Sequence, residues 1–313
     1  MGNFLVTGGA GFIGSYIAKR LINENNGVWI IDNLSTGFKE NVPAEATFVY
    51  GNCQDPMILA SLAKIKFDAI IHMAAQSSGE ISFEDPIYDL QTNVESTLRL
   101  CNFALENRCQ RFIYASSMSI YGVVTELPVK EDSRCEPLSF YGVGKLASEK
   151  YLKIYEKKGL KPTILRFFNV YGPGQNMGNL KQGMVSIYLA QLLNNDKIIV
   201  KGPLDRFRDL IYVEDVVDAV MLSLKSAEAV GKIFNVGTGK QTTVKELLKK
   251  LMDLSGIHKP VIETSSTPGD QFGIYADVSR IQNELGFSPK YTLEEGLRPM
   301  IDWAKTSESR DAK

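Results

Sequence analysis

The sequence predicts an α/β fold, a doubly wound parallel sheet with a smaller C-terminal lobe, and two observations predict it. In the first half of the chain, short apolar runs rich in β-branched residues alternate with helical patterns of period near 3.6, which is typical of βαβ units around a parallel sheet. After a Gly/Asn-rich break at about residues 171–179 this rhythm becomes irregular. We therefore expect a first domain at residues 1–170 and a lobe formed mainly by residues 171–313, with segments that return to the first domain.

Each element of the sheet is expected from a short apolar run. Every run ends in the polar or small residues expected where a strand brings the chain to a ligand, and the runs are residues 3–7, 27–32, 46–51, 67–73, 111–117 and 162–167. Helices are expected between them, for example at residues 12–25 and 85–107. In the second of these helices, apolar residues recur at intervals of three or four positions, and we expect them to cover the sheet: Ile87, Leu90, Val94, Leu98, Cys101 and Leu105. After the break we expect a helix at residues 183–194 and a strand within residues 232–239.

Composition narrows the classes of function. The chain has 313 residues, 44% of them hydrophobic, and a net charge of -1, so it carries no surplus of positive charge for a nucleic-acid backbone or an anionic membrane. The N-terminal segment lacks a basic leader and glycines interrupt its apolar run, so we expect neither a signal peptide nor a membrane span, and a cytoplasmic location. Four cysteines without CxxC spacing and two isolated histidines predict no metal site and no disulfide framework.

The stretch TGGAGFIGS follows the first expected strand and opens a helix, with Gly8, Gly11 and Gly14 in the spacing GxxGxxG. Gly8 permits a tight turn, Gly11 lets the backbone approach a pyrophosphate, and Gly14 lets helix and strand pack closely. Asp32, at the end of the second strand, can accept hydrogen bonds from an adenosine ribose diol and repels a 2′-phosphate. These features predict a Rossmann-type site that prefers NAD to NADP. The alternative is a structural turn beside a solvated aspartate.

Tyr141 and Lys145 lie four positions apart near the start of an expected helix, so they share one face. A free phenol has a pKa of about 10, which is too high for a base at neutral pH, but a nearby ammonium and a nicotinium ring both favour the phenolate. The alternative is a half-exposed helix face, because both residue types tolerate partial exposure. The glycine loop upstream and the stretch ASSMSIYG at the end of a neighbouring strand favour the base.

With these residues the sequence resembles the extended short-chain dehydrogenase/reductase superfamily, and within it the NAD-dependent nucleotide-sugar epimerase/dehydratase family, including the UDP-hexose 4-epimerases. Motifs through nearly the whole chain carry the resemblance: TGGAGFIG, DNLSTG, HMAAQ, NV at 93, ASSMSIYG, YGVGK, LRFFNVYGPG, RDLIYVEDV, FNVGTG and ADVSRIQNELGF. The resemblance implies NAD as the cofactor, a nucleotide-sugar bound between two lobes, and a homodimer. The helix of residues 86–107 and the helix that follows Tyr141 would form the dimer interface, although their apolar stripes are most simply explained as core.

The resemblance also implies a role for individual residues. Ser117, Tyr141 and Lys145 match the family's catalytic residues: Tyr141 is the base, Ser117 assists the proton transfer from the sugar hydroxyl, and Lys145 bonds the nicotinamide ribose. Residues matched to the cofactor site are Gly8, Gly11, Phe12, Ile13, Gly14, Asp32, Asn33, Ser35, Gly37, Asn52, Cys53, Met73, Ala74, Ala75, Gln76, Asn93, Tyr141, Lys145 and Phe168. Residues matched to the substrate site are Ser78, Ser117, Asn169, Arg208, Asp270 and Ile274.

The reaction follows from the neighbours of Ser117. In this family the tyrosinate removes a proton from the sugar 4-OH while hydride leaves C4, which gives a 4-keto sugar. Dehydratases and the decarboxylase of the family have TDE or TSE where this chain has Ser117, Met118 and Ser119, and neither Met118 nor Ser119 can do acid–base work of that kind. The simplest fate of the keto sugar is rotation and return of the hydride to the opposite face. The resemblance therefore implies 4-epimerisation of a UDP-linked hexose. The alternatives are a dehydratase, a decarboxylase or a C4 oxidoreductase acting on a GDP- or CDP-linked sugar, and a non-catalytic NAD-binding relative.

The phosphate contacts depart from the family in one place. Arg208 is expected as a charge-assisted phosphate donor, and the alternative is an ion pair with Asp205 or Asp209. The family often has an arginine three residues before Asp270, where this chain has Thr267. One phosphate contact is therefore expected to be missing.

Two further residues carry separate expectations. Ile274 matches the position that gates the substituent at sugar C2, and its intermediate size suits either a hydroxyl or an acetamido group. His72 ends an apolar strand, so we expect a core histidine with a backbone partner rather than a catalytic group.

Overall fold

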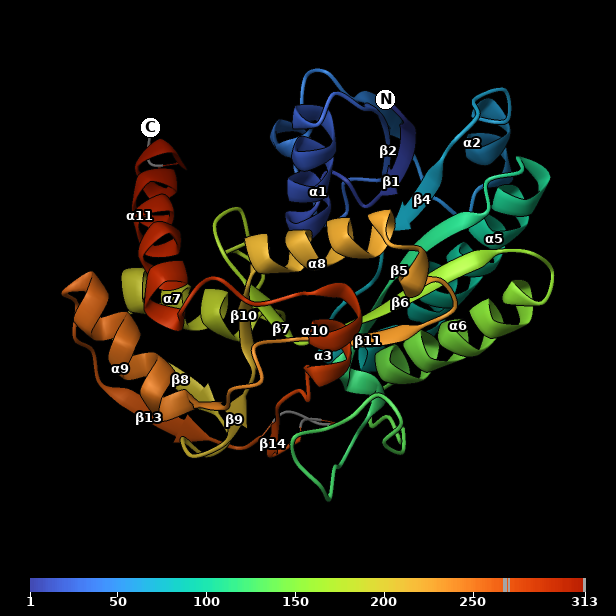
Figure 1. The fold of residues 1–313 in the computed structure, drawn as a ribbon. Helices are drawn as coiled ribbons and strands as arrows, with labels where there is room; N and C mark the ends of the chain where they lie inside the picture. Colours follow the sequence, from blue (N-terminus) through green and yellow to red (C-terminus); the bar gives the residue numbers. More distant parts are fainter. Residues whose placement is uncertain (267–268, 270, 312–313) are drawn as a thin grey trace.

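The computed structural model, which describes residues 1–266, 269 and 271–311, is built on a seven-stranded parallel sheet (Figure 1). The strand order is β3-β2-β1-β4-β5-β6-β11. The strands are β1 (Asn3–Thr7), β2 (Gly27–Asp32), β3 (Thr47–Tyr50), β4 (Ala69–His72), β5 (Arg111–Ser117), β6 (Lys161–Phe167) and β11 (Ile233–Val236). The order reverses between β1 and β4, and in doubly wound sheets ligands bind at such a reversal, outside the carboxyl ends of the strands. The predicted fold class is confirmed.

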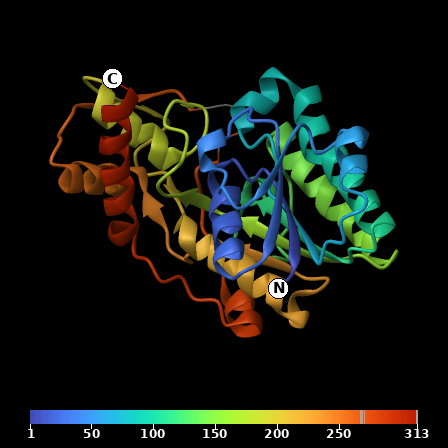
Figure 2. The ribbon, with the colours of Figure 1, turned by 90° about the horizontal axis from the view of Figure 1, so that it is seen from above.

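Helices cover both faces of the sheet, which explains why its strands are apolar without alternation. Neighbouring residues of β1 point to opposite faces: Val6 joins the hydrophobic cluster under α1 and α8, and Leu5 joins the cluster under α2, α5 and α6. These helices are α1 (Phe12–Asn23), α2 (Pro56–Ser61), α5 (Ser96–Glu106), α6 (Phe140–Glu156) and α8 (Val213–Lys225). Figure 2 shows the two helix layers on either side of the sheet.

The expected helix at residues 85–107 consists of three consecutive parts. They are α4 (Pro86–Leu90), a π-helical turn, η2 (Gln91–Glu95), and α5. Cys101 is fully buried as expected, but Ile87 and Leu90 are 64% and 53% exposed. The expectation that this whole stripe covers the sheet is therefore wrong in its first part, because α4 packs mainly against α6 and η2.

A third cluster of hydrophobic side chains forms the smaller lobe. It is built by β7 (Asn169–Tyr171), α7 (Met184–Asn194), β8 (Ile198–Lys201), β10 (Leu210–Tyr212), α9 (Val244–Ser255), β13 (Val261–Thr264) and α11 (Leu293–Asp311). Here β7 pairs with β10 and β8 pairs with β13. The chain returns to the sheet twice, because α8 packs on α1 and β11 pairs with β6. The exact boundary of the two domains stays a prediction.

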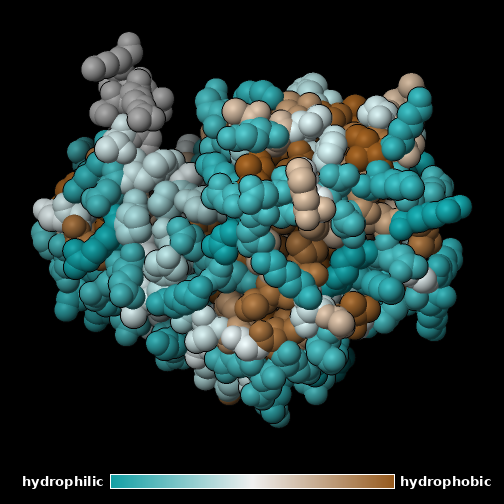
Figure 3. Space-filling model, turned by 45° about the horizontal axis from the view of Figure 1, so that its top comes forward, coloured by the Kyte–Doolittle hydropathy of each residue, from teal (hydrophilic) through white to brown (hydrophobic). Residues whose placement is uncertain are grey.

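Shorter elements complete the described chain. They are α3 (Gly79–Glu84), α10 (Ser279–Leu285), the 3-10 turns η1 (Lys39–Asn41), η3 (Met118–Ile120) and η4 (Ala227–Ala229), and a small sheet of β9 (Phe207–Arg208), β12 (Thr242–Thr243) and β14 (Gly273–Ile274). On the face shown in Figure 3, hydrophilic side chains cover most of the surface and hydrophobic ones show between them in groups. Among the residues that the structure describes, no helix has the length and apolar character to cross a membrane, and no three His, Cys, Asp or Glu side chains gather as a metal site.

Candidate active site

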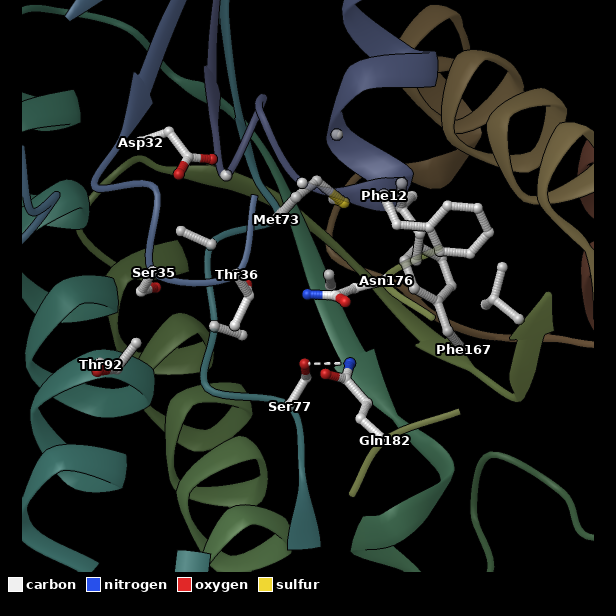
Figure 4. Close-up of a pocket in the computed structure, with 18 of the residues that line it drawn as sticks. Phe12, Asp32, Ser35, Thr36, Met73, Ser77, Thr92, Phe167, Asn176 and Gln182 are labelled. Atoms are coloured by element: carbon white, nitrogen blue, oxygen red, sulfur yellow. Dashed lines mark hydrogen bonds between the residues drawn. The ribbon is translucent and has the colours of Figure 1, made fainter. Parts of the chain in front are cut away.

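A cavity of about 320 Å³ lies at the carboxyl ends of the central strands, where the strand order reverses. Most of the residues predicted to form the site line it: Gly8, Gly11, Phe12, Ile13, Gly14, Asp32, Asn33, Ser35, Asn52, Cys53, Met73, Ala74, Ala75, Ser117, Tyr141, Lys145, Phe168 and Asn169. Figure 4 shows that Asp32 lies near one end of the view and that Ser77 and Gln182 meet near the other. Side chains from β2, from the loop after β4 and from residues 173–183 thus line one cavity.

The glycine loop has the geometry that its spacing predicts. Gly8 has φ +70°, a conformation that side chains other than glycine rarely adopt, and a Cβ there would lie 2.7 Å from the Ala74 nitrogen. A Cβ on Gly14 would lie 2.2 Å from the Gly8 carbonyl oxygen. Gly11 is the N-cap of α1, and no described side chain caps this helix. The amide groups and the positive end of α1 are thus left for an anion, and this arrangement fits a pyrophosphate.

Asp32 joins the glycine loop to β2. Its Oδ2 accepts a hydrogen bond from the Ala10 amide at 2.9 Å, and its Oδ1 accepts one from the Leu34 amide at 2.8 Å. The carboxylate keeps further lone pairs at the cavity wall, where they can accept hydrogen bonds from a ribose diol. Gly37 does not line the cavity but allows its loop to pack on the glycine loop, since a Cβ there would lie 2.7 Å from the Ala10 carbonyl carbon.

Ser117, Tyr141 and Lys145 come together at the cavity from β5 and α6. Ser117 ends β5, where its Oγ accepts a hydrogen bond from the Ser119 amide at 3.1 Å. Ser139 caps α6 and sets its start, because its Oγ accepts from the Gly142 amide at 3.1 Å. Lys145 Nζ donates to the Ala115 carbonyl at 2.8 Å and lies 5.9 Å from the centre of the Tyr141 ring.

Comparison with known proteins agrees with this geometry. The model of the NAD dependent epimerase/dehydratase family matches residues 4–237. The chain belongs to this family. A putative UDP-glucose 4-epimerase of Methanocaldococcus jannaschii is 35% identical over 97% of this chain and 98% of its own. The crystal structure of the Thermotoga maritima UDP-glucose 4-epimerase with UDP-glucose is 34% identical, covers 98% of this chain and 99% of its own, and has a TM-score of 0.94. The Thermus thermophilus UDP-glucose 4-epimerase complex with NAD is 32% identical, with coverage of 97% and 99% and a TM-score of 0.90.

As a member of this epimerase/dehydratase family, the chain is an enzyme that uses NAD, and the residues at the cavity fit that cofactor. The uncapped start of α1, the space that a side chain on Gly14 would fill and the carboxylate of Asp32 match a pyrophosphate and an adenosine ribose. Of the predicted cofactor residues, Gln76 and Asn93 do not line the cavity but lie buried behind its wall.

The proton affinities differ from what the spacing of Tyr141 and Lys145 predicts. Burial raises the pKa of Tyr141 to about 12, and a hydrogen bond with Ser117 lowers it by less than burial raises it. Burial lowers the pKa of Lys145 to about 8, against the opposing effect of Asp89. Desolvation of the phenolate is thus the larger effect on Tyr141, and the expectation that the ammonium and a nicotinium ring together favour the phenolate stays a prediction.

The segment of residues 173–183 closes the cavity from the smaller lobe, and the sequence analysis missed it. Gln182 Nε2 donates to Ser77 Oγ at 2.5 Å, and the Ser78 hydroxyl donates to the Lys181 carbonyl at 2.7 Å. Ser78, expected to bind substrate, therefore holds this segment and does not line the cavity. Other polar residues that were not predicted also line it, among them Ser77, Thr92, Ser119, Asn176, Asn179 and Gln182. The Gly/Asn-rich composition of residues 171–179 was the available signal, and it was interpreted only as a break between domains.

The other predicted substrate residues differ in their placement. Asn169 lines the cavity, and its buried Oδ1 has no hydrogen-bond partner among the described residues, so it is available to a ligand. Arg208 lies buried outside the cavity wall and donates to the carbonyls of Phe207 and Gln271.

Ile274 is fully buried in the core and does not line the cavity. Thr267 and Asp270 lie outside the described residues. Asp209, one of the expected ion-pair partners of Arg208, accepts hydrogen bonds from the amides of Thr238 and Gly239.

His72 is a core histidine, as expected, but its partners are side-chain hydroxyl groups. Its Nδ1 lies 2.7 Å from Thr7 Oγ1, and its Nε2 lies 3.2 Å from Thr97 Oγ1. The expected backbone partner is wrong. Burial lowers the pKa of His72 to about 3, so the ring is neutral near pH 7.

Proposed function

We propose that this chain is a UDP-sugar 4-epimerase that inverts C4 of a UDP-linked hexose through a 4-keto intermediate. The observation that carries the proposal is the charge of the cavity wall. Among the described residues that line it, Asp32 is the only acid, and its two oxygens are hydrogen-bonded to the glycine loop and the loop after β2. The sugar end therefore offers Tyr141 as its acid–base group and no carboxylic acid that could assist the loss of water.

Tyr141 would remove the proton from the sugar 4-OH through Ser117 and return it by the same path. NAD held at the glycine loop would supply reversible hydride transfer at C4, so the overall reaction would involve no net oxidation. Inversion requires the keto sugar to be held with either face toward the cofactor. The carboxamides and hydroxyls of Asn169, Asn176 and Ser119 can each both donate and accept hydrogen bonds, so they can hold both orientations.

The cavity wall holds Ser117, Tyr141 and Lys145 together, which argues against a non-catalytic NAD-binding relative. Several similar proteins are UDP-glucose 4-epimerases, which supports an epimerase over a dehydratase, a decarboxylase or a C4 oxidoreductase. The similar Thermotoga maritima structure contains UDP-glucose, which supports UDP as the nucleotide of the proposed substrate.

We further propose that the enzyme is a cytoplasmic homodimer. α4 and α6 pack against each other, and together they expose apolar side chains on one surface: Ile87, Leu90, Phe140, Val143 and Ile154. Each of these side chains is between 48% and 64% exposed. Exposed apolar groups of this kind mark interaction surfaces, and a second copy of the same two helices would cover them.

The test is incubation of the purified protein, without added cofactor, with UDP-, GDP-, CDP- and dTDP-linked sugars. Products are analysed by mass spectrometry and proton NMR. We expect a product of unchanged mass that is inverted at C4, formed from a UDP-linked hexose, and we expect Tyr141→Phe to lose most of this turnover. Loss of water or carbon dioxide, or turnover only after an oxidant is added, would overturn the proposal.

A further inference from the structure

A buried carboxylate, which no motif of the sequence singles out, lies behind the catalytic wall of the cavity. Asp89 of α4 is 1% exposed. Its Oδ1 accepts hydrogen bonds from Gln76 Nε2 at 2.7 Å and from Asn93 Nδ2 at 2.9 Å. Its Oδ2 faces α6: a Cβ on Gly144 would lie 3.4 Å from that oxygen. Gly144 stands in sequence between Tyr141 and Lys145, so the carboxylate lies against the turn of helix that carries both.

The hydrogen bonds around Asp89 join three parts of the site. Asn93 Nδ2 also donates to the Gln76 carbonyl at 2.9 Å, and Gln76 exchanges hydrogen bonds with the backbone of Ser78. The Asn93 carbonyl accepts from Ser148 Oγ of α6 at 2.9 Å. Asp89 thus connects the loop after β4, the π-helical turn η2 and α6. π-helical turns occur frequently at functional sites, because they re-aim side chains that a regular helix would point elsewhere.

The charges near Lys145 leave Asp89 as its counter-charge. Lys145 is the one cation among the described residues that line the cavity, and it is 2% exposed. The other carboxylate that acts on it is Glu149, which already forms a buried salt bridge with Arg166 at 2.8 Å. Burying an ammonium without a partner is costly.

The effect of Asp89 has the same sign on both members of the catalytic pair. Its negative charge raises the pKa of Lys145 and also that of Tyr141. Other titratable groups also lie near Asp89 and Lys145. α6 contributes Tyr141 and Glu149, and Cys53, which follows β3, would also raise the pKa of Lys145. Burial raises the pKa of Asp89 itself, while its hydrogen bonds and Lys145 favour the carboxylate.

We propose that Asp89 is a positioning residue whose negative charge holds Lys145 as an ammonium and sets the pH range in which Tyr141 and Lys145 act together. Removing the charge lowers the proton affinity of both groups. Tyr141 then loses its proton at a lower pH, and Lys145 becomes neutral at a lower pH. The pH dependence of a step that needs both groups therefore moves toward acid with them.

The test is Asp89→Asn, which removes the charge and keeps an Oδ1 that can accept from Gln76 and Asn93. Asp85→Asn is the matched control, since Asp85 lies four residues earlier, accepts from the Tyr88 amide as the exposed cap of α4, and touches none of the catalytic residues. The first readout is the ultraviolet titration of the Tyr141 phenol in the unliganded protein, taken as the difference from the matching Tyr141→Phe protein. The second is the pH profile of turnover, which rests on the proposed function.

We expect the Tyr141 midpoint and the turnover profile of Asp89→Asn to move toward acid by about one pH unit, and those of Asp85→Asn to stay in place. A pH profile of Asp89→Asn that shows lower turnover at an unchanged optimum would mean that Asp89 is purely structural. An unchanged midpoint of the Tyr141 titration would mean that Asp89 carries no charge. Either result overturns the proposal. If no nucleotide-sugar is turned over by the wild type, the proposed function fails and the phenol titration still decides about Asp89. Should Asp89→Asn not fold, Asp89→Ser removes the charge and leaves a hydroxyl acceptor for the same titration.

Discussion

Replacing Gly14 by alanine tests whether close packing of α1 on the glycine loop creates the cofactor site. The new Cβ would lie 2.2 Å from the Gly8 oxygen and 2.8 Å from the Gly8 carbonyl carbon, where ordinary contact begins at 3.4 Å. Loop and helix must therefore separate by about 1 Å, because both obstacles are backbone atoms. Overpacking of this kind costs about 1–3 kcal/mol, and the better helix propensity of alanine returns at most about 1 kcal/mol. The same displacement moves the amides at the start of α1 away from a pyrophosphate.

Thermal unfolding and NAD binding by calorimetry measure the two effects. We expect Gly14→Ala to lower the unfolding temperature by a few degrees and to weaken NAD binding by about tenfold or more, which corresponds to about 1.4 kcal/mol. Gly79→Ala is the control: Gly79 also stands in the first turn of a helix, and the nearest atom to its Cβ is at 3.8 Å. Unchanged unfolding and unchanged NAD affinity in Gly14→Ala would refute the reasoning.

Three further outcomes are expected. The double substitution Ile87→Glu and Ile154→Glu should convert the proposed dimer to a monomer, as measured by light scattering. The control Val123→Glu, at a 69% exposed position outside α4 and α6, should leave the dimer intact. A monomeric wild type would contradict the proposed dimer. Arg166→Met removes the positive charge that pairs with the buried carboxylate of Glu149 and leaves it, among the described residues, only the hydrogen bond from Ser116. We therefore expect a loss of about 3–5 kcal/mol in urea unfolding, and a loss below about 1 kcal/mol would contradict this account. The pKa of His72 is about 3 in the folded chain, below its unfolded value of about 6.5, so the unfolded chain gains the proton first on acidification. Below about pH 6, the stability advantage of the wild type over His72→Gln should therefore fall by about 1.4 kcal/mol per pH unit. A difference in stability that does not depend on pH would contradict the buried neutral histidine.

The sheet and the cofactor loop could be predicted because their determinants are local. A strand that ends at Thr7, a glycine with positive φ at Gly8 and a helix that begins at Phe12 are specified by about ten consecutive residues. The apolar stripe of residues 86–107 shows the limit of such reasoning. Periodicity gives the face on which Ile87 and Cys101 lie, but it does not say whether a sheet, another helix or a second copy of the chain covers that face.

The sugar end of the cavity could not be predicted, because its contacts join distant segments. The hydrogen bond between Ser77 and Gln182 joins residues 105 positions apart. Residues 173–183 carry no hydrophobic period from which a register could be derived. The segment is held by side chains that bond to its carbonyls, such as the Tyr16 hydroxyl, which donates to the Pro173 carbonyl. The resemblance predicted Ser78 as a substrate residue, but its neighbour Ser77 lines the cavity. A motif match gives a position in the sequence and does not give the direction in which each side chain points.

The pair Tyr141 and Lys145 shows why residue types at a spacing do not determine proton affinities. Four positions on a helix place both groups at one wall, which the sequence predicts, but burial then acts on both pKa values against the charged forms. Burial raises the pKa of Tyr141 to about 12 and lowers that of Lys145 to about 8, so helical spacing alone does not make the phenol a base near pH 7. For the proposed reaction the phenolate must be favoured by further positive charge, which is what the sequence analysis expects of the nicotinium ring.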